Sequence, residues 1–313
     1  MTYRNALPQL EDRPFLTDGG LETDLIFNHG VDLPEFASFD LLKDEEGIAR
    51  LRAYFEPYAK LARDRGVGFV LESPTWRASS NWAGRIGYSD EEVADMNRRA
   101  IALMEEIRAE YETDQSPFVI SGNLGPEGDG YDPERFLSAD AAQAYHRPQV
   151  ETFAGTAADQ VTALTMTYPE EAIGIVRAAR EAEIPVAISF TVETDGRLPN
   201  GQDLGAAIAQ TKDEADGGPD YFMLNCAHPT HFDDVVAGAG DWAQEIRGLR
   251  ANASTCSHAE LDEATELDDG DPQDLARRYR DLRSSLPRLT ILGGCCGTDY
   301  RHVEAISDAW QAA

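Results

Sequence analysis

The chain has 313 residues, and its 57 acidic against 27 basic side chains give a formal net charge of −30. An electrostatic field of this sign repels nucleic-acid phosphates and anionic membrane surfaces, so neither nucleic acid nor membrane is an expected partner. No apolar run approaches the ~18 residues of a membrane span, and the first residues lack the apolar stretch of a signal peptide, so the expected location is the cytoplasm.

Short apolar runs alternate with longer amphipathic stretches along the whole chain. Several of the runs are apolar without a period of two, which is typical of strands covered on both faces. In chain order, the expected strands are 15–19, 68–72, 118–122, 161–166, 185–190, 221–225, 248–251 and 289–292. Helical patterns lie between them at 44–65, 89–111, 139–157, 169–182, 202–216 and 271–286.

Two of these helices have recognisable starts. Ser89 with Glu92 fits a capping box, and Pro169 suits the first turn of a helix. The alternation of strands and helices predicts an α/β fold, a (β/α)8 TIM barrel that fills residues 1–313 as a single domain. A doubly wound open sheet is the alternative, although no GxGxxG motif follows an early strand. The irregular stretches 122–132 and 252–272 would be loops over the active site or merely solvated insertions.

The most unusual motif is Gly-Gly-Cys-Cys-Gly-Thr at residues 293–298, directly after the last expected strand. The geometry of a normal disulfide does not suit neighbouring cysteines, whereas Cys295 and Cys296 can bind one soft metal ion together. Cys226 follows another expected strand, and the strand ends of a barrel share one face. Three thiolates would leave one position of a tetrahedral Zn²⁺ site open, as catalytic zinc requires. Buried small side chains are the alternative, which the clustering disfavours.

Together these motifs resemble the homocysteine S-methyltransferases, the zinc-dependent group that contains betaine– and S-methylmethionine–homocysteine methyltransferases. The resemblance covers about residues 15–306. Its specific elements are LTDGG at 16–20, Asn225-Cys226 and GGCCGT at 293–298, with weaker support from TWRAS at 75–79 and LGP at 124–126. The resemblance implies a (β/α)8 barrel and Zn²⁺ held by Cys226, Cys295 and Cys296.

The implied reaction moves a methyl group onto a thiol. Binding to zinc removes the proton of the acceptor thiol and yields a thiolate, which would attack a methyl group of a sulfonium or ammonium donor. The expected partners are therefore a small-molecule thiol acceptor, homocysteine, and a small methyl donor, S-methylmethionine first and betaine second; the product would be methionine. The chain shows no folate or cobalamin module.

The resemblance also implies roles for individual residues. Asp18 and Thr75 would be the catalytic residues that position the acceptor, and Gly19 and Gly20 would let the backbone approach it. Asn225 would orient the loop that carries Cys226 through side-chain hydrogen bonds. From the residues alone, Asp18 with Gly19 also fits an ordinary turn, and Thr75 an ordinary loop hydroxyl.

One position departs from the family pattern. Where the fourth strand of the family ends in a glutamate that pairs with the ammonium group of the acceptor, this chain has Met166. Either Glu72, Glu170 or Glu171 substitutes for that carboxylate, or the acceptor is a thiol other than homocysteine in its usual pose. The alternative function within the enzyme class is therefore a zinc-dependent alkyltransferase that acts on a different thiol.

A non-catalytic zinc or thiol-redox protein is the alternative from another class. It would need a fourth protein ligand, such as Cys256 or a histidine. His228 and His231 are the histidines nearest to Cys226 in the sequence, and loop packing is the expected role of both. Trp76 and Tyr168 fit a pocket for a cationic donor, because aromatic faces attract onium groups, and they fit packing at the barrel rim equally well.

The acidity itself is dispersed along the chain, and only three of the basic residues are lysines. This composition is typical of a halophilic-type surface, where a salty cytoplasm screens the repulsion between carboxylates. It favours betaine slightly as a donor, because salt-stressed cells accumulate it.

Overall fold

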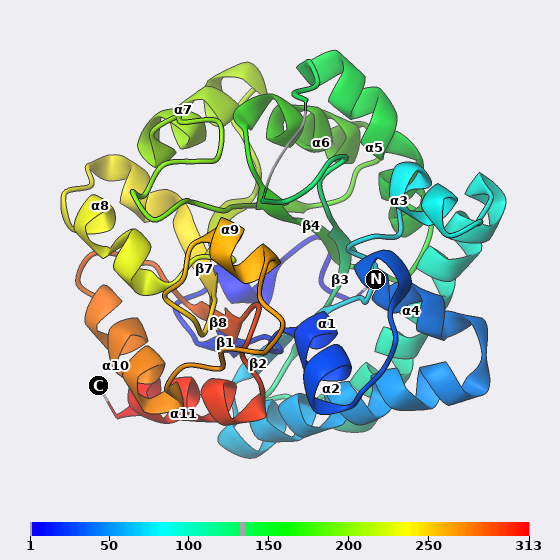
Figure 1. Cartoon of the computed structure of the whole chain (residues 1–313), viewed down its shortest axis with the longest axis horizontal. Coiled ribbons are helices and arrows are strands. Elements are labelled where there is room, and N and C mark those ends of the chain that lie inside the picture. The colour runs from blue at the N-terminus through cyan, green and yellow to red at the C-terminus, as the bar shows by residue number, and fades with distance from the viewer. Residues whose placement is uncertain (1, 132–134, 313) are drawn as a thin grey trace.

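Eight parallel strands close into one barrel in the computed structural model, which describes residues 2–131 and 135–312. Each strand pairs with its neighbours in chain order, and β1 pairs with β8 to complete the ring (Figure 1). The strands are β1 (Phe15–Leu16), β2 (Gly68–Glu72), β3 (Phe118–Leu124), β4 (Gln160–Met166), β5 (Val186–Phe190), β6 (Tyr221–Asn225), β7 (Ile246–Ala251) and β8 (Ile291–Gly294). The predicted single-domain TIM barrel is confirmed, although residues 1, 132–134 and 313 of the expected domain lie outside the described part.

Helices surround the barrel on its outer side (Figure 1). The longer ones are α2 (Glu45–Arg65), α4 (Asp90–Tyr111), α5 (Ala139–Ala154), α6 (Pro169–Glu181), α7 (Leu204–Glu214), α10 (Pro272–Leu282) and α11 (Tyr300–Gln311). Short helices are α1 (Leu21–Thr23), α3 (Ser80–Arg85), α8 (Asp233–Ala237) and α9 (His258–Asp262). The capping box of Ser89 with Glu92 and the start of α6 at Pro169 are both confirmed.

The barrel interior changes character from one end to the other. Its amino-terminal part is apolar and contains Phe15, Val70, Val119, Ala187, Met223 and Ile291. Because side chains two residues apart point to the same side of a strand, the next inward-facing positions are polar and include Glu72 after Val70 and Asn225 after Met223. The carboxyl ends of the strands therefore surround a polar floor rather than a continuous apolar core.

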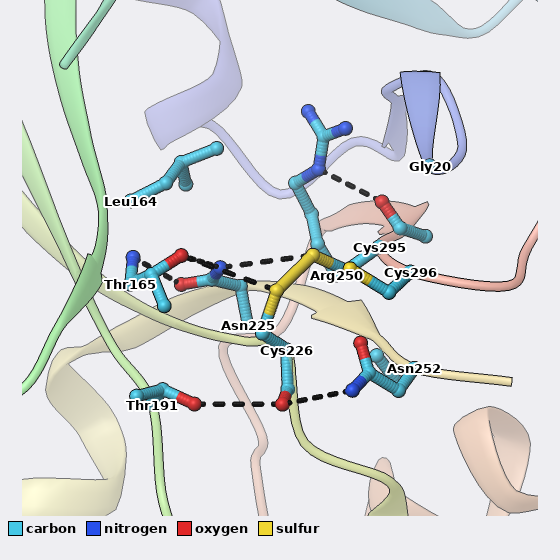
Figure 2. The surroundings of a disulfide bond; sticks show 12 residues. Gly20, Leu164, Thr165, Thr191, Asn225, Cys226, Arg250, Asn252, Cys295 and Cys296 are labelled. Carbon is cyan, nitrogen blue, oxygen red and sulfur yellow. Dashed lines mark hydrogen bonds between the residues drawn. A yellow bond between two sulfur atoms is a disulfide. The ribbon is translucent and has the colours of Figure 1, made fainter. Parts of the chain in front are cut away.

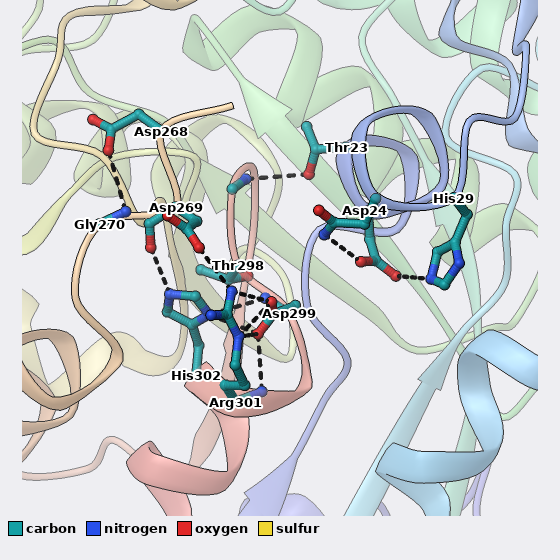
Figure 3. Close-up of polar contacts among 12 residues, drawn as sticks. Thr23, Asp24, His29, Asp268, Asp269, Gly270, Thr298, Asp299, Arg301 and His302 are labelled. Atoms are coloured by element: carbon teal, nitrogen blue, oxygen red, sulfur yellow. Dashed lines mark hydrogen bonds and ion pairs between the residues drawn. The ribbon is translucent and has the colours of Figure 1, made fainter. Parts of the chain in front are cut away.

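The stretch 252–272 crosses over the mouth of the barrel and contains α9 (Figure 1). Its far end is fastened to the start of α11, where Arg301 Nη2 pairs with Asp269 Oδ2 at 2.7 Å and His302 Nε2 donates to the Asp269 carbonyl at 2.8 Å (Figure 3). Of the other expected loop, 122–132, the first residues continue β3, and Asp132 lies outside the described residues. Over residues 2–131 and 135–312, no helix has the length and apolar character needed to cross a membrane.

Candidate active site

A cavity of about 410 Å³ opens at the carboxyl ends of the strands. The loops after β1, β2, β3, β6, β7 and β8 and the end of β4 itself contribute to its wall. Of the residues singled out in the sequence, Asp18, Gly19, Gly20, Asn225 and the three motif cysteines line it. The functional residues of this fold gather on that face, so the position of the cavity is the expected one.

The three motif cysteines converge although about 70 residues separate Cys226 from the pair. Their sulfur atoms all lie within 4.8 Å of one another. Cys226 follows β6 directly and has a left-handed φ of +54°, and Cys295 follows β8 directly. Figure 2 shows the sulfur atoms of Cys226 and Cys295 joined by a disulfide, beside Cys296, which keeps a free thiol.

The disulfide between Cys226 and Cys295 is a finding that the sequence analysis did not anticipate. It leaves the neighbours Cys295 and Cys296 unjoined, as their spacing requires. Because a metal ligand must be a thiolate, a metal can use all three sulfurs only after two-electron reduction of this bond. Burial raises the pKa of the Cys296 thiol, and its hydrogen bond from Tyr131 opposes the shift.

The donor set fits a soft metal with an open position. Among the residues that the structure describes, no histidine, carboxylate or further cysteine joins the three-sulfur cluster, so Cys256 and the histidines supply no fourth ligand. All three cysteines lie in the cavity wall, so a metal that they held would be reachable by a ligand in the cavity. Three thiolates with an open site suit Zn²⁺.

Asn225, the residue before Cys226, is fixed by a network of hydrogen bonds. Its Oδ1 accepts a hydrogen bond from Ser189 Oγ at 2.6 Å. Figure 2 shows the two bonds to Thr165: Oδ1 accepts from the Thr165 amide at 2.8 Å, and Nδ2 donates to Thr165 Oγ1 at 2.8 Å. The Cys226 carbonyl accepts from Asn252 Nδ2 at 3.0 Å and lies 2.7 Å from His258 Nε2. These hydrogen bonds connect Asn225 and the Cys226 backbone to β4, β5 and the segment after β7, and the orienting role of Asn225 stays a prediction.

Gly19 and Gly20 are needed because two loops touch at that point. A Cβ atom on Gly19 would lie 2.8 Å from the Thr298 carbonyl oxygen, and one on Gly20 would collide with the Cys295 carbonyl. The Gly20 amide donates to the Thr298 carbonyl at 2.9 Å. The pair therefore lets the loop after β1 pack against the loop that carries the cysteines.

Asp18 is buried in an ionic contact. Its Oδ1 lies 2.9 Å from Arg250 Nη2, and its Oδ2 accepts from the Tyr54 hydroxyl at 3.1 Å. Burial raises the pKa of the Asp18 carboxyl, and Arg250 and Tyr54 oppose that shift. Asp18 therefore lines the cavity as a partner of Arg250 rather than as a free carboxylate.

Thr75 is the predicted site residue that does not line the cavity. Its hydroxyl donates to the Asn123 carbonyl at 2.8 Å and contacts Ser73 Oγ at 2.7 Å. Of the two aromatic residues proposed for a donor pocket, Trp76 lines the cavity, whereas Tyr168 does not and instead accepts from the Leu137 amide at 2.9 Å.

The departure at Met166 has a structural counterpart. The pairing of β4 with β5 shifts between Ala163 and Met166, and Thr165 has a left-handed φ of +63°. Leu164 and Thr165 consequently line the cavity, while Met166 is fully buried in the hydrophobic core and does not line it. The chain therefore presents no ionised side chain at the expected place on β4.

Two of the three candidate replacements are engaged elsewhere. Glu171 lies 2.9 Å from His146 Nε2, and Glu170 accepts from Gln210 Nε2 at 3.1 Å; neither lines the cavity. Glu72, at the end of β2, does line it.

The histidine that lies against the sulfur cluster is not one of the two that are nearest to Cys226 in the sequence. His228 contacts Thr230 and His231 contacts the Thr255 carbonyl, as loop packing predicts, but the histidine against the cluster is His258 in α9. Its ring stacks on Tyr131, with ring centres 4.1 Å apart, and the Tyr131 hydroxyl donates to Cys296 Sγ at 3.3 Å. Neither residue belongs to a periodic segment, so only their place in the two long loops hinted at them.

Carboxylates dominate the cavity wall. Apart from the cysteines and Tyr131, two basic residues line it, Arg77 and Arg250. The acidic residues that line it are Asp18, Glu22, Glu72, Asp129, Asp262, Glu266 and Asp268. Such a wall favours a cationic ligand over an anionic one.

A (β/α)8 barrel with a cysteine cluster at the carboxyl ends of its strands defines the class of protein. The model of the Homocysteine S-methyltransferase family matches residues 15–310, and the chain belongs to that family. It is 24% identical over 281 residues to the methionine synthase of Mycobacterium leprae, a match that covers 82% of this chain and 20% of that protein. The chain thus corresponds to about a fifth of that relative.

Solved structures of the Escherichia coli homocysteine methyltransferase MmuM share the fold. The oxidized form gives a TM-score of 0.72 at 18% identity, and the metallated form gives 0.71 at 18% identity. Each comparison covers 97% of this chain and 98% of that one.

Proposed function

We propose that this protein is a zinc-dependent methyltransferase that moves a methyl group from a small onium donor to homocysteine, giving methionine. The observation that carries the proposal is the convergence of three cysteine sulfurs within 4.8 Å in the wall of a cavity, with no fourth ligand from the described chain. Cys226, Cys295 and Cys296 would hold the metal, which when bound would deprotonate the acceptor thiol.

The transfer itself is a displacement. The acceptor sulfur forms a bond to the methyl carbon while the bond from that carbon to the donor heteroatom breaks. The bonding electron pair stays on the donor, which leaves as a neutral thioether or amine. Around this step, Asp18 with Arg250 and the backbone at Gly19 and Gly20 would position the acceptor, and Asn225 would hold the Cys226 loop. Thr75 would act through the Asn123 carbonyl that it bonds.

The donor follows from the charge of the cavity. S-methylmethionine and betaine both present a positively charged onium group, which the acidic wall attracts. Trp76 adds an aromatic surface of the kind that binds such groups. S-methylmethionine remains the first proposal.

The disulfide seen in this structure and the proposed metal-bound state can be two forms of the same cysteine site. The relative MmuM has been solved in oxidized, metallated and apo forms. We propose that the disulfide of this chain marks an oxidised, metal-free form of the site, and that the cytoplasm, which keeps thiols reduced, is where the protein works.

Metal analysis of the reduced protein tests the proposal, combined with X-ray absorption at the zinc edge before and after homocysteine is added. We expect one zinc with three sulfur ligands that becomes four-sulfur with homocysteine, followed by methionine formation when S-methylmethionine or betaine is added. A three-sulfur shell that ignores homocysteine but accepts another thiol would favour the alkyltransferase alternative. Absence of zinc from the reduced protein would refute the mechanism.

A further inference from the structure

Glu72 is a buried carboxylate without a hydrogen-bond partner. It is only 3% exposed, and neither of its oxygen atoms accepts a hydrogen bond from the described chain. The neighbouring hydroxyls of Ser121 and Thr162 bond to each other at 2.7 Å instead. Because folded proteins almost always satisfy buried polar groups, two open oxygens on one side chain at the floor of a cavity indicate a missing donor.

Arg250, at the end of β7, is the complementary case. It is 5% exposed; its Nε donates to the Gly294 carbonyl at 3.0 Å, and its Nη2 donates to the Gly19 carbonyl at 2.9 Å. Its Nη1 is buried and has no partner in the described chain. The same residue touches the cysteine loop, because its carbonyl accepts from the Cys226 amide at 3.1 Å.

The other inner carboxylates of the cavity are already occupied. Asp18 pairs with Arg250 and accepts from Tyr54, and Glu22 accepts from Ser38 Oγ at 2.7 Å. Among the described residues of the cavity wall, Glu72 is the carboxylate whose two buried oxygens both lack a partner, and Arg250 Nη1 is an open guanidinium nitrogen next to the cysteine loop. Arg77 Nε also lacks a hydrogen-bond partner, but it lies in the loop after β2, where the guanidinium group stacks on Trp82. An α-amino acid carries the matching pair, an ammonium group and a carboxylate on the same carbon.

The geometry points to Glu72 and Arg250 Nη1 as the recognition site for the amino-acid end of the thiol acceptor. Glu72 accepts hydrogen bonds from the α-ammonium group, and Arg250 Nη1 donates to the α-carboxylate. This inference rests on the proposed function and adds the residues of this chain that recognise the α-ammonium and α-carboxylate groups of the acceptor. It also explains how the chain dispenses with a carboxylate at the end of β4, since Glu72 supplies the charge from β2.

Three thiol ligands test the ammonium contact and the carboxylate contact separately, with the wild-type protein. Homocysteine carries both groups, 4-mercaptobutanoate lacks the ammonium, and 3-aminopropane-1-thiol lacks the carboxylate. Binding to the reduced, zinc-loaded full chain is measured by isothermal titration calorimetry. We expect homocysteine to bind about 10- to 100-fold more tightly than either analogue, because each analogue leaves one buried charged group unpaired.

The variant Glu72→Gln then assigns the ammonium contact. It keeps the size of the side chain and removes its charge, so the preference for homocysteine over 4-mercaptobutanoate should fall to about fivefold or less, while 4-mercaptobutanoate binds as before. Glu170→Gln is the matched control, because Glu170 lies outside the cavity, and it should keep the full preference.

The outcomes distinguish this inference from the proposed function. Wild-type protein that binds homocysteine and 4-mercaptobutanoate equally well, or Glu72→Gln protein that keeps the full preference, would overturn the inference and leave the methyltransferase standing. Zinc-loaded protein that binds none of the three thiols would overturn both. The wild-type series needs no variant, so the test holds even if Glu72→Gln fails to fold.

Discussion

Asn225 and Thr165 bond to each other twice, once through the Thr165 amide and once through its hydroxyl, each at 2.8 Å. Thr165 has a left-handed backbone, which a β-branched residue adopts only when its surroundings compensate for the strain. The two bonds provide that compensation, and they join the end of β4 to the residue before Cys226. The position of the first cysteine is thereby tied to the bulge in β4.

Asn225→Ala should weaken zinc binding. The substitution removes both bonds to Thr165 and the support beneath Cys226, and loss of such supporting contacts typically costs about 10- to 100-fold in metal affinity. Competition with a chromogenic chelator under reducing conditions measures the change. Asn200→Ala, which alters an exposed loop residue, is the control and should leave zinc affinity unchanged; equal affinities for both variants would contradict the role given to Asn225.

Glu72 gives the stability of the protein a specific pH dependence. Burial raises its pKa from 4.5 to about 7, and the positive charge of Arg250 opposes the shift. The folded state therefore holds a proton that the unfolded state has lost, and the contribution of Glu72 to stability falls as the pH rises from about 4.5 to 7. Glu72→Gln removes this loss.

Glu72→Gln should consequently be more stable than wild type at pH 8, by up to about 3 kcal/mol for a shift of this size. The difference should shrink toward zero near pH 4.5. Urea unfolding of both proteins across this range measures it. A difference that does not change with pH would show that the buried carboxylate is not the cause.

Oxidised protein should take up no zinc. While Cys226 and Cys295 are bonded to each other, only the Cys296 thiol remains for the metal, and reduction should restore one zinc per chain. Atomic absorption after gel filtration measures both states. Cys256→Ser should retain the metal, because Cys256 lies outside the cluster, whereas Cys226→Ser should lose most of it. Zinc retained by the oxidised protein would place the metal elsewhere.

Gly20→Ala should destabilise the fold by about 1–3 kcal/mol, as overpacking of a tight contact does. The added methyl group meets the Cys295 carbonyl and the Thr23 hydroxyl. Gly84→Ala, inside α3 where no atom lies within 4 Å of the new Cβ, is the matched control. It should be neutral or stabilise by up to about 1 kcal/mol, since alanine favours helices. Thermal unfolding compares the two.

Salt should stabilise this protein more than a neutral solute does. With a net charge of −30, repulsion between carboxylates opposes the compact state, and screening at 2 M KCl should raise the Tm by about 10 °C relative to 0.1 M. Sucrose of equal osmolality is the control for general solute effects. An equal rise in both solutions would argue against the halophilic interpretation of the composition.

The barrel could be predicted because its strands are short, doubly covered apolar runs. β2 and β6 were predicted at their observed residues, 68–72 and 221–225. β1 is shorter than expected, since residues 17–20 already turn toward the cysteine loop. Helix α11 was not among the predicted helices. The short helices α1, α3, α8 and α9 were also not predicted, because a helix of so few turns does not show a period of 3.6 in the sequence.

The cysteine cluster could be predicted because strand ends meet on one face, which turns sequence position into spatial proximity. The same logic does not extend to loops. His258 and Tyr131 reach the cluster along irregular backbone whose course no periodicity encodes. Arg250 was overlooked because it lies within an expected strand, where its unpaired nitrogen becomes visible only once its neighbours are placed.

The contacts of Arg250 also have a consequence for folding during synthesis. By donating to both the Gly19 and the Gly294 carbonyls, it joins the loop after the two-residue strand β1 to the last strand, β8. The sulfur cluster straddles that same seam. During synthesis, Cys226 must therefore wait for a segment 69 residues further along the chain before Cys295 exists, and a nascent chain that stops before β8 can neither close the ring nor complete the sulfur cluster.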